Sequence, residues 1–353
     1  MVHITPLSPT DVHGILGGSK ALNPITDQMY SPEGDLSRSY GGPDSTEIAV
    51  GSERILRTMQ SGKPFFIGRN GSTEQAALSF WFTLRKSGRT WPTDIRRNLY
   101  IGAGIWPPTD ESLDKWAQEY MSALGLVDGL AAGWYRPFAN AESVLLDYAA
   151  PKAFRTPLRA LETYYTLPEF RWTRHLANKK VAVVTSFSKT VAEQTSSPDR
   201  IYSIWKSMKE AGTILPLTTT WIPIRSHFHS EVAMGDSTEW PAEINNWDEA
   251  ANYIVEGVKA SGATVALIGC GALGMIIGGR LRQLGISVVV MGGAIQVLFG
   301  IKGRRWERHE VISKFWSESW VWPSESETPR GSLKIEGGCY WSMSGSAPST
   351  TPR

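Results

Sequence analysis

Three short segments of the sequence carry residue types that bind phosphate, and each comes at the end of an apolar run. They read RNGSTE at 69–74, SFSK at 186–189 and GCGALG at 269–274. The last one has the G-x-G-x-x-G pattern, in which a glycine turn and a helix N-terminus present backbone N–H groups to a diphosphate. Because ligands of open parallel sheets bind outside the carboxyl ends of the strands, we expect the three segments to lie together.

A basic cluster beside a tryptophan follows the second apolar run of the glycine-rich region, which spans 286–291. Guanidinium groups bind phosphate oxygens bidentately, and an indole face can stack on a base or a sugar ring. The cluster therefore favours a nucleotide site near the glycine turn. It consists of Lys302, Arg304, Arg305 and Trp306.

The glycine turn is open to other interpretations. An NAD site calls for an acid about 20 residues after the turn, whereas this chain has 288–291 there and its next acid is Glu307. An adenosylmethionine-dependent enzyme, or a turn that only packs a helix tightly, also fits the pattern. The 15 tryptophans of the chain are in addition compatible with a non-catalytic carbohydrate-binding protein.

The elements that must position these residues alternate between strand and helix patterns. We expect strands at 64–68, 99–104, 127–134, 144–148, 179–187, 212–218, 265–268 and 286–291. Helices are expected at 48–59, 75–86, 110–124, 157–165, 246–258, 274–284 and 306–322, with Asp110 and Asn246 as caps. This alternation predicts an α/β fold, a Rossmann-like open and mostly parallel sheet with flanking helices.

The sequence also predicts how the chain is divided into segments. Residues 1–50 are expected to be irregular, 51–342 to form a single α/β domain, and 343–353 to be a disordered tail. The loop 221–242 holds the pair His227 and His229, which we interpret as surface or partly buried residues because no Cys or further His stands near them.

Composition limits the class of protein and its partners. The 353 residues are 41% hydrophobic and 20% charged, which describes a globular protein with a large core. The net charge of +2 gives no general attraction to nucleic acid. No transmembrane run or signal peptide is recognisable, and one of only two cysteines lies inside the glycine turn. We therefore expect a cytoplasmic location.

The segments at 69–74, 176–194 and 265–306, taken in this order, resemble motifs of glycosyltransferases with the GT-D-type fold. The first is similar to their Arg-Phe-Gly-Asp-Gly-Glu loop, the second to a Lys-Lys-Val strand with a polar turn and a following Gln, and the third to their nucleotide-associated βαβ unit. The resemblance covers about residues 55–342. It implies transfer of a sugar from a nucleotide sugar, such as a UDP-sugar, to a glycan, glycoprotein or other hydroxyl acceptor.

The resemblance also implies roles for individual residues. Glu74 would act in catalysis and hold a divalent metal, Mn²⁺ or Mg²⁺, although Ser72 replaces the family's Asp and puts metal dependence in question. The implied donor-binding residues are Arg69, Asn70, Gly71, Ser72, Thr73, Ser186, Ser188, Lys189, Gly269, Gly271, Gly274, Lys302, Arg304, Arg305 and Trp306.

Overall fold

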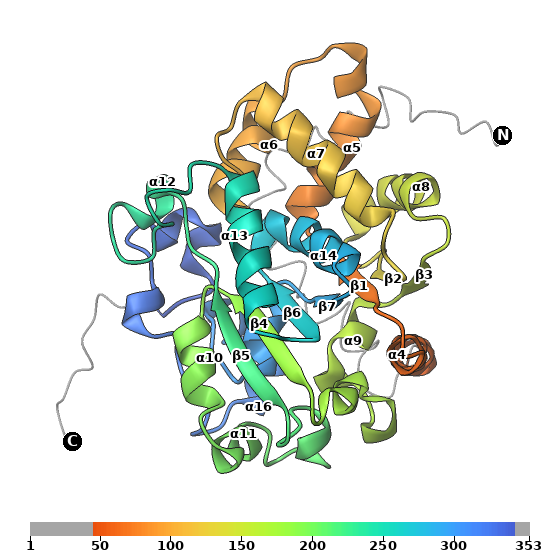
Figure 1. Cartoon of the computed structure of the whole chain (residues 1–353), viewed down its shortest axis with the longest axis vertical. Helices are drawn as coiled ribbons and strands as arrows, with labels where there is room; N and C mark the ends of the chain where they lie inside the picture. Colours follow the sequence, from red (N-terminus) through yellow and green to blue (C-terminus); the bar gives the residue numbers. More distant parts are fainter. Residues whose placement is uncertain (1–44, 343–353) are drawn as a thin grey trace.

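The computed structural model describes residues 45–342, except for the side chains of Ser45, Lys86 and Arg136. Its centre is a seven-stranded sheet in which every strand pairing is parallel, in the order β3-β2-β1-β7-β6-β4-β5 (Figure 1). The α/β class and the parallel sheet predicted from the sequence are thereby confirmed. The strands are β1 Phe66–Arg69, β2 Gly129–Ala131, β3 Phe154–Thr156, β4 Lys180–Thr185, β5 Thr220–Arg225, β6 Val265–Gly269 and β7 Ser287–Val290.

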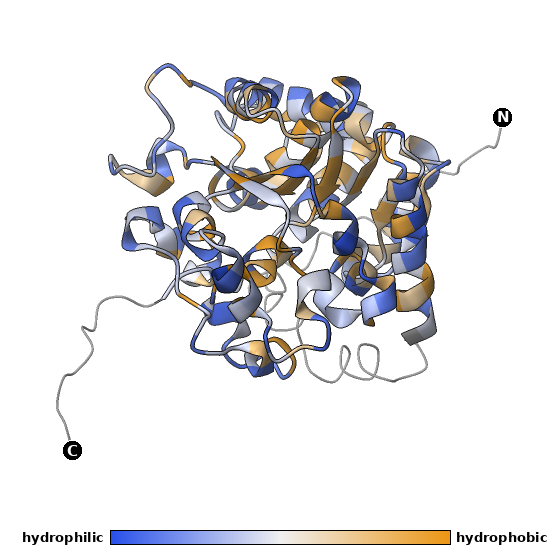
Figure 2. Cartoon of the chain, turned by 60° about the horizontal axis from the view of Figure 1, so that its bottom comes forward, coloured by the Kyte–Doolittle hydropathy of each residue, from blue (hydrophilic) through white to orange (hydrophobic). Residues whose placement is uncertain are grey.

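Helices cover both faces of the sheet and form two hydrophobic cores. In β6 the side chains alternate, with Ala266 and Ile268 in one core and Val265 and Leu267 in the other. This explains why the strand reads as a continuous apolar run. Figure 2 shows the apolar strands enclosed between helices whose outer surfaces are hydrophilic.

Each core includes its own set of helices. The first packs against α5 Ser72–Thr83, α6 Thr93–Arg97, α7 Asp110–Leu124, α8 Ala139–Ala149, α13 Trp247–Ala260 and α14 Gly274–Gln283. The second packs against α4 Ser45–Gln60, α9 Leu158–Leu161, α10 Ser188–Gln194, α11 Pro198–Ile204, α12 Ser230–Ala233, α15 Ala294–Leu298 and α16 Ile312–Phe315.

Neighbouring central strands send the chain to opposite faces, which opens a crevice at their carboxyl ends. After β1 the chain enters α5 in the first core, whereas after the adjacent β7 it enters α15 in the second. The same divergence separates β6, which leads into α14, from β4, which leads into α10. A divergence of this kind is the usual ligand site of an open α/β sheet.

Helix caps follow the sequence closely. The side chain of Asn246 accepts hydrogen bonds from the N–H groups of Asp248 and Glu249, as expected for an N-cap. Helix α7 is capped one residue earlier than predicted, since Thr109 accepts from the N–H of Ser112.

Five short-range predictions are wrong. Residues 98–102 form a π-helix, 144–148 belong to α8, and 212–218 hold only the 3₁₀ turn Ala211–Thr213. Strand β5, at one edge of the sheet, lies where the sequence predicts a loop. Of the predicted helix 306–322, only Ile312–Phe315 is α-helical. Short apolar runs fit a strand and a buried helix equally well, so tertiary packing decided these segments.

At the chain ends, residues 45–50 belong to α4 rather than to an irregular segment. The predicted irregular region 1–44 and the predicted tail 343–353 lie outside the described residues. Between residues 45 and 342, no helix combines the length and the apolar character needed to cross a membrane.

Candidate functional site

A cavity of about 190 Å³ lies at the carboxyl ends of the central strands, and residues of the three segments 69–74, 186–189 and 269–274 line it together. Residues that follow β1, β4, β5, β6 and β7 line it, together with the C-terminal residues 335–341. Of the site residues predicted from the sequence, those that line this cavity are Arg69, Gly71, Ser72, Thr73, Glu74, Ser186, Gly269, Gly271 and Arg305.

Arg69, the last residue of β1, brings a cation to the cavity wall. Its guanidinium carbon lies 4.5 Å from the centre of the Trp134 ring, in cation–π geometry. Its Nε is buried and has no hydrogen-bond partner within residues 45–342. A buried N–H of a charged group without an acceptor is costly. Because Arg69 also lines the cavity, the cavity wall carries a cation suited to an anion.

A buried hydrogen-bond network holds the backbone behind Arg69. Asn70 accepts from Tyr120 Oη at 3.0 Å and donates to Glu142 at 3.0 Å. The same carboxylate accepts from Gln75 and from the N–H of Gly133. Burial raises the pKa of Glu142, while these hydrogen bonds lower it. Asn70 is fully buried and therefore positions the loop instead of lining the cavity.

Glu74 lies in the first turn of α5 and folds its carboxylate over Gly71, whose added Cβ would lie 1.9 Å from Glu74 Oε2. Burial raises the pKa of Glu74 above its usual value, whereas its own backbone N–H and the nearby Arg69 lower it. Glu74 thus occupies the helix start, where a carboxylate compensates the helix dipole, and at the same time lines the cavity.

Arg305 supplies a second cation at the turn that follows β7. It lies 4.7 Å from the Tyr340 ring centre and forms a 3.1 Å ion pair with Glu336. A Cβ on Gly292 would lie 2.3 Å from Arg69 Nη1, and one on Gly293 would lie 3.5 Å from Arg305 Nη1. The two guanidinium groups therefore flank the Gly292–Gly293 turn, a pairing suited to two phosphate groups.

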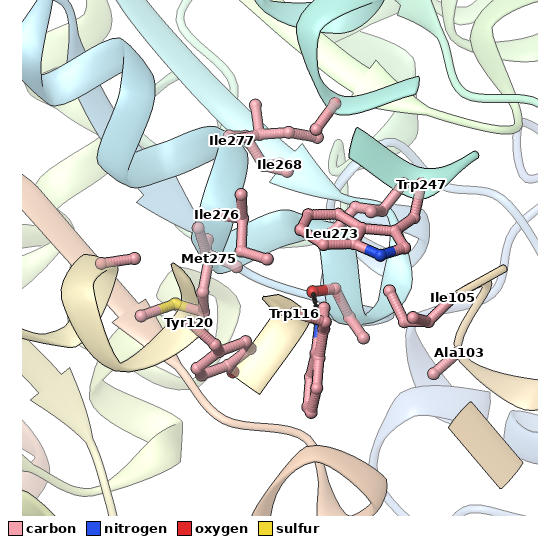
Figure 3. Packing of buried hydrophobic residues seen from close by; sticks show 14 of the residues in the cluster. Ala103, Ile105, Trp116, Tyr120, Trp247, Ile268, Leu273, Met275, Ile276 and Ile277 are labelled. Atoms are coloured by element: carbon pink, nitrogen blue, oxygen red, sulfur yellow. Dashed lines mark hydrogen bonds between the residues drawn. The ribbon is translucent and has the colours of Figure 1, made fainter. Parts of the chain in front are cut away.

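The G-x-G-x-x-G turn is partly closed by the protein itself, although Gly269 and Gly271 line the cavity. Gly271 has φ +57°, and a Cβ there would lie 2.7 Å from the carbonyl oxygen of Ala103. That carbonyl accepts the N–H of Ala272 at 3.1 Å, and Trp116 Nε1 donates to the carbonyl of Ala272 at 3.2 Å. Figure 3 shows Ala103 and Trp116 packed against the start of α14. One of the N–H groups expected to cradle phosphate is thus already bonded.

The remaining predicted residues lie outside the cavity lining. The N–H groups of Lys189 and Thr190 donate to the buried carboxylate of Glu327, so the start of α10 holds an internal anion. Trp306 is buried, and Arg304 donates to the carbonyl of Gly337. The predicted residues outside the lining are Asn70, Ser188, Lys189, Gly274, Lys302, Arg304 and Trp306.

Several cavity residues were not recognised from the sequence. His227 and His229 line the cavity, although the sequence predicts them only as surface or partly buried residues without a role in the site. The signal was their position directly after β5, which the sequence analysis had not identified as a strand. Tyr120 comes from α7, while Glu336, Tyr340 and Trp341 come from the C-terminal segment. Nothing local in the sequence links these residues to the strand ends.

The donor set limits how the site could hold a divalent metal. Within residues 45–342 no three His, Cys, Asp or Glu side chains gather as metal ligands. The cavity carries two carboxylates, Glu74 and Glu336, of which Glu336 pairs with Arg305. Mg²⁺ is commonly held by one or two carboxylates together with substrate phosphates. The residues therefore fit a cation shared with a bound diphosphate, with Glu74 as its protein ligand.

Comparisons of the chain with protein-family models, curated proteins and solved structures found no match in any of the three.

Proposed function

We propose that the protein is a glycosyltransferase that binds a nucleotide sugar, such as a UDP-sugar, in the cavity at the strand ends. The observation that carries the proposal is the unpartnered buried Nε of Arg69 at the end of a central strand. It calls for an anionic ligand, and Arg305 across the Gly292–Gly293 turn suits the second phosphate of a diphosphate. The order of the three sequence motifs resembles that of GT-D-type glycosyltransferases, and this resemblance is the reason for proposing a nucleotide sugar as the anionic ligand.

In this proposal the chain's own residues stabilise the leaving group. When the sugar–phosphate bond breaks, negative charge grows on the diphosphate, and fixed cations near it lower the barrier. Arg69 and Arg305 would supply that charge, while Trp134 and the Asn70–Glu142 network hold Arg69 in place. A divalent cation, when bound at Glu74 with the donor, would add further charge neutralisation.

The alternative of an NAD-dependent enzyme has less support. The Ala272 N–H is bonded to the protein, and β7 is followed by Met291-Gly292-Gly293, without an acid for the ribose. A surface carbohydrate-binding protein would need accessible indole rings. All 15 tryptophans fall within residues 45–342, and each is buried or only partly exposed.

Thermal denaturation with a panel of ligands tests the proposal. UDP and UDP-sugars should raise the melting temperature, since a ligand at about 100 times its dissociation constant adds roughly 2.7 kcal/mol of stability. NAD and adenosylmethionine serve as the competing ligands. Stabilisation by NAD alone would contradict the glycosyltransferase proposal.

The same assay with and without Mn²⁺ tests the metal. If Glu74 shares a cation with the diphosphate, Mn²⁺ should tighten UDP binding and have little effect on the free protein. Ser72→Asp restores the family's second acid and should strengthen this dependence. A protein indifferent to Mn²⁺ in both forms would remove the metal from the proposal and leave the nucleotide site standing.

A further inference from the structure

His229 is the cavity residue whose environment is most specific for chemistry. It follows β5 and directly precedes α12, and only 4% of its surface is exposed. Its ring stacks on Tyr100, with ring centres 4.4 Å apart and planes at 19°, and Trp106 packs nearby at 6.0 Å. The ring is therefore held rigidly in one orientation at the wall of the cavity.

The hydrogen bonds of His229 fix its tautomer. Nε2 lies 2.8 Å from the carbonyl oxygen of Tyr100. A carbonyl can only accept, so Nε2 carries the hydrogen and Nδ1 of the neutral ring is left with a lone pair. Nδ1 is buried and has no partner in the described part of the chain. An acceptor atom of this kind needs an O–H or N–H donor, and the cavity is where a ligand could supply one.

The surroundings also keep the ring neutral near pH 7. Burial lowers the pKa of His229 below its usual value, and the charge of Lys334 adds to this, while the Tyr100 carbonyl and Glu231 act in the opposite direction. A neutral imidazole whose N–H is held by a carbonyl can accept a proton on its other nitrogen, as general bases do.

We propose that Nδ1 of His229 is the general base for the hydroxyl group that receives the sugar. This deepens the proposed glycosyltransferase function and rests on it. The acceptor proton moves to Nδ1 as the acceptor oxygen bonds to the anomeric carbon. The bond from that carbon to the β-phosphate oxygen breaks, and its electron pair stays on the diphosphate beside Arg69. The Tyr100 carbonyl then stabilises the imidazolium through Nε2–H, until the proton passes to solvent.

In this assignment, different parts of the cavity wall bind the diphosphate and accept the proton. Arg69, Glu74 and Arg305 surround the β1 and β7 strand ends, where the diphosphate is proposed to bind, and the Glu74 carboxylate is engaged by its own helix start. His229 comes from the end of β5, beyond β6 and β4 in the sheet order. The sequence alone had suggested Glu74 for catalysis, so the two hypotheses make opposite predictions for their variants.

The experiment measures UDP release from a panel of UDP-sugars, with water as the acceptor, together with UDP affinity by calorimetry. His229→Gln keeps an N–H donor for the Tyr100 carbonyl but loses the acceptor at Nδ1. It should release UDP at least about 100-fold more slowly and bind UDP within about threefold of the wild type. If His229→Gln does not fold, His229→Asn replaces it. This variant keeps an acceptor oxygen near the Nδ1 position but takes up no proton, so it should show the same slow UDP release. His175→Gln, outside the cavity lining, is the matched control and should match the wild type.

The pH profile separates a base from a residue that only supports the fold. The wild-type rate should stay level from pH 8 down to about 6.5 and fall only below that value as Nδ1 is protonated, and this acid limb should be absent from the His229→Gln residual rate. Nitrogen NMR of the free protein should show a protonated Nε2 and an unprotonated Nδ1 at pH 7.

Three results would overturn the assignment, and they can be told apart. Full UDP release by His229→Gln removes the base role alone, as does an NMR spectrum with a protonated Nδ1 at pH 7. A wild-type protein that binds no uridine nucleotide removes the proposed function, and the role of His229 in sugar transfer with it.

Discussion

The β1–α5 and β6–α14 turns look alike in sequence and differ in the structure. Each is an apolar strand, a glycine turn and a helix on the same face of the sheet. The first presents Arg69 and Glu74 to the cavity. In the second the N–H of Ala272 is bonded to Ala103, and Gly278 and Gly279 are occupied by close contacts with Phe66 and Ala123. A glycine pattern thus indicates close approach of something, which can be a ligand or the protein itself.

In this comparison, the largest effect on nucleotide binding is expected for the variant Arg69→Gln. The change removes the charge but keeps a polar side chain, so nucleotide binding and transfer should fall about 100- to 1000-fold. Stability without ligand should change by less than about 1 kcal/mol, because the lost cation has an unmet donor. Calorimetry with UDP and urea denaturation measure the two. Arg304→Gln, outside the cavity lining, is the matched control, and equal losses in both variants would break the comparison.

For the β6–α14 turn, Gly271→Ala should act on stability. An alanine at φ +57° is strained, and its Cβ would lie 2.7 Å from the Ala103 carbonyl oxygen. We expect a loss of about 3 kcal/mol in the free energy of unfolding, measured by urea denaturation. An unchanged unfolding midpoint together with lost UDP affinity would instead make this turn a ligand cradle.

Glu74→Gln is expected to have an intermediate effect that distinguishes the roles assigned within the first turn. If Glu74 mainly compensates the helix dipole, stability should fall by less than about 1 kcal/mol and UDP release should stay within about tenfold. A loss of 100-fold or more in UDP release would instead support a role of Glu74 in catalysis or in metal binding, as the resemblance implies.

The smallest effect is expected from Gly71→Ala, the counterpart of Gly271→Ala in the first turn. Its backbone, φ −79° and ψ 162°, suits any residue, and the atom a new Cβ would meet is the flexible end of Glu74. Unfolding free energy should therefore change by less than about 1 kcal/mol, while UDP affinity shifts as the carboxylate moves. A loss as large as that of Gly271→Ala would mean that the two turns are built alike after all.

Local sequence determined the elements that depend on short-range chemistry. Val265–Gly269 had to be a strand buried on both faces because its side chains are apolar on both, and Asn246 had to begin a helix because its side chain accepts from the next turn. Each of these signals lies within a few residues of the element that it specifies, so it can be recognised in one sequence.

Only the tertiary structure decided which of these residues share a site. The strand order placed β1 beside β7, which lies more than 200 residues later in the chain, and so set Arg69 against the Gly292–Gly293 turn. It also brought His229 from β5 into the same cavity, carried the start of α10 to Glu327, and closed the glycine turn with Ala103. Such contacts depend on chain crossings and packing between distant segments, for which the sequence has no local signal.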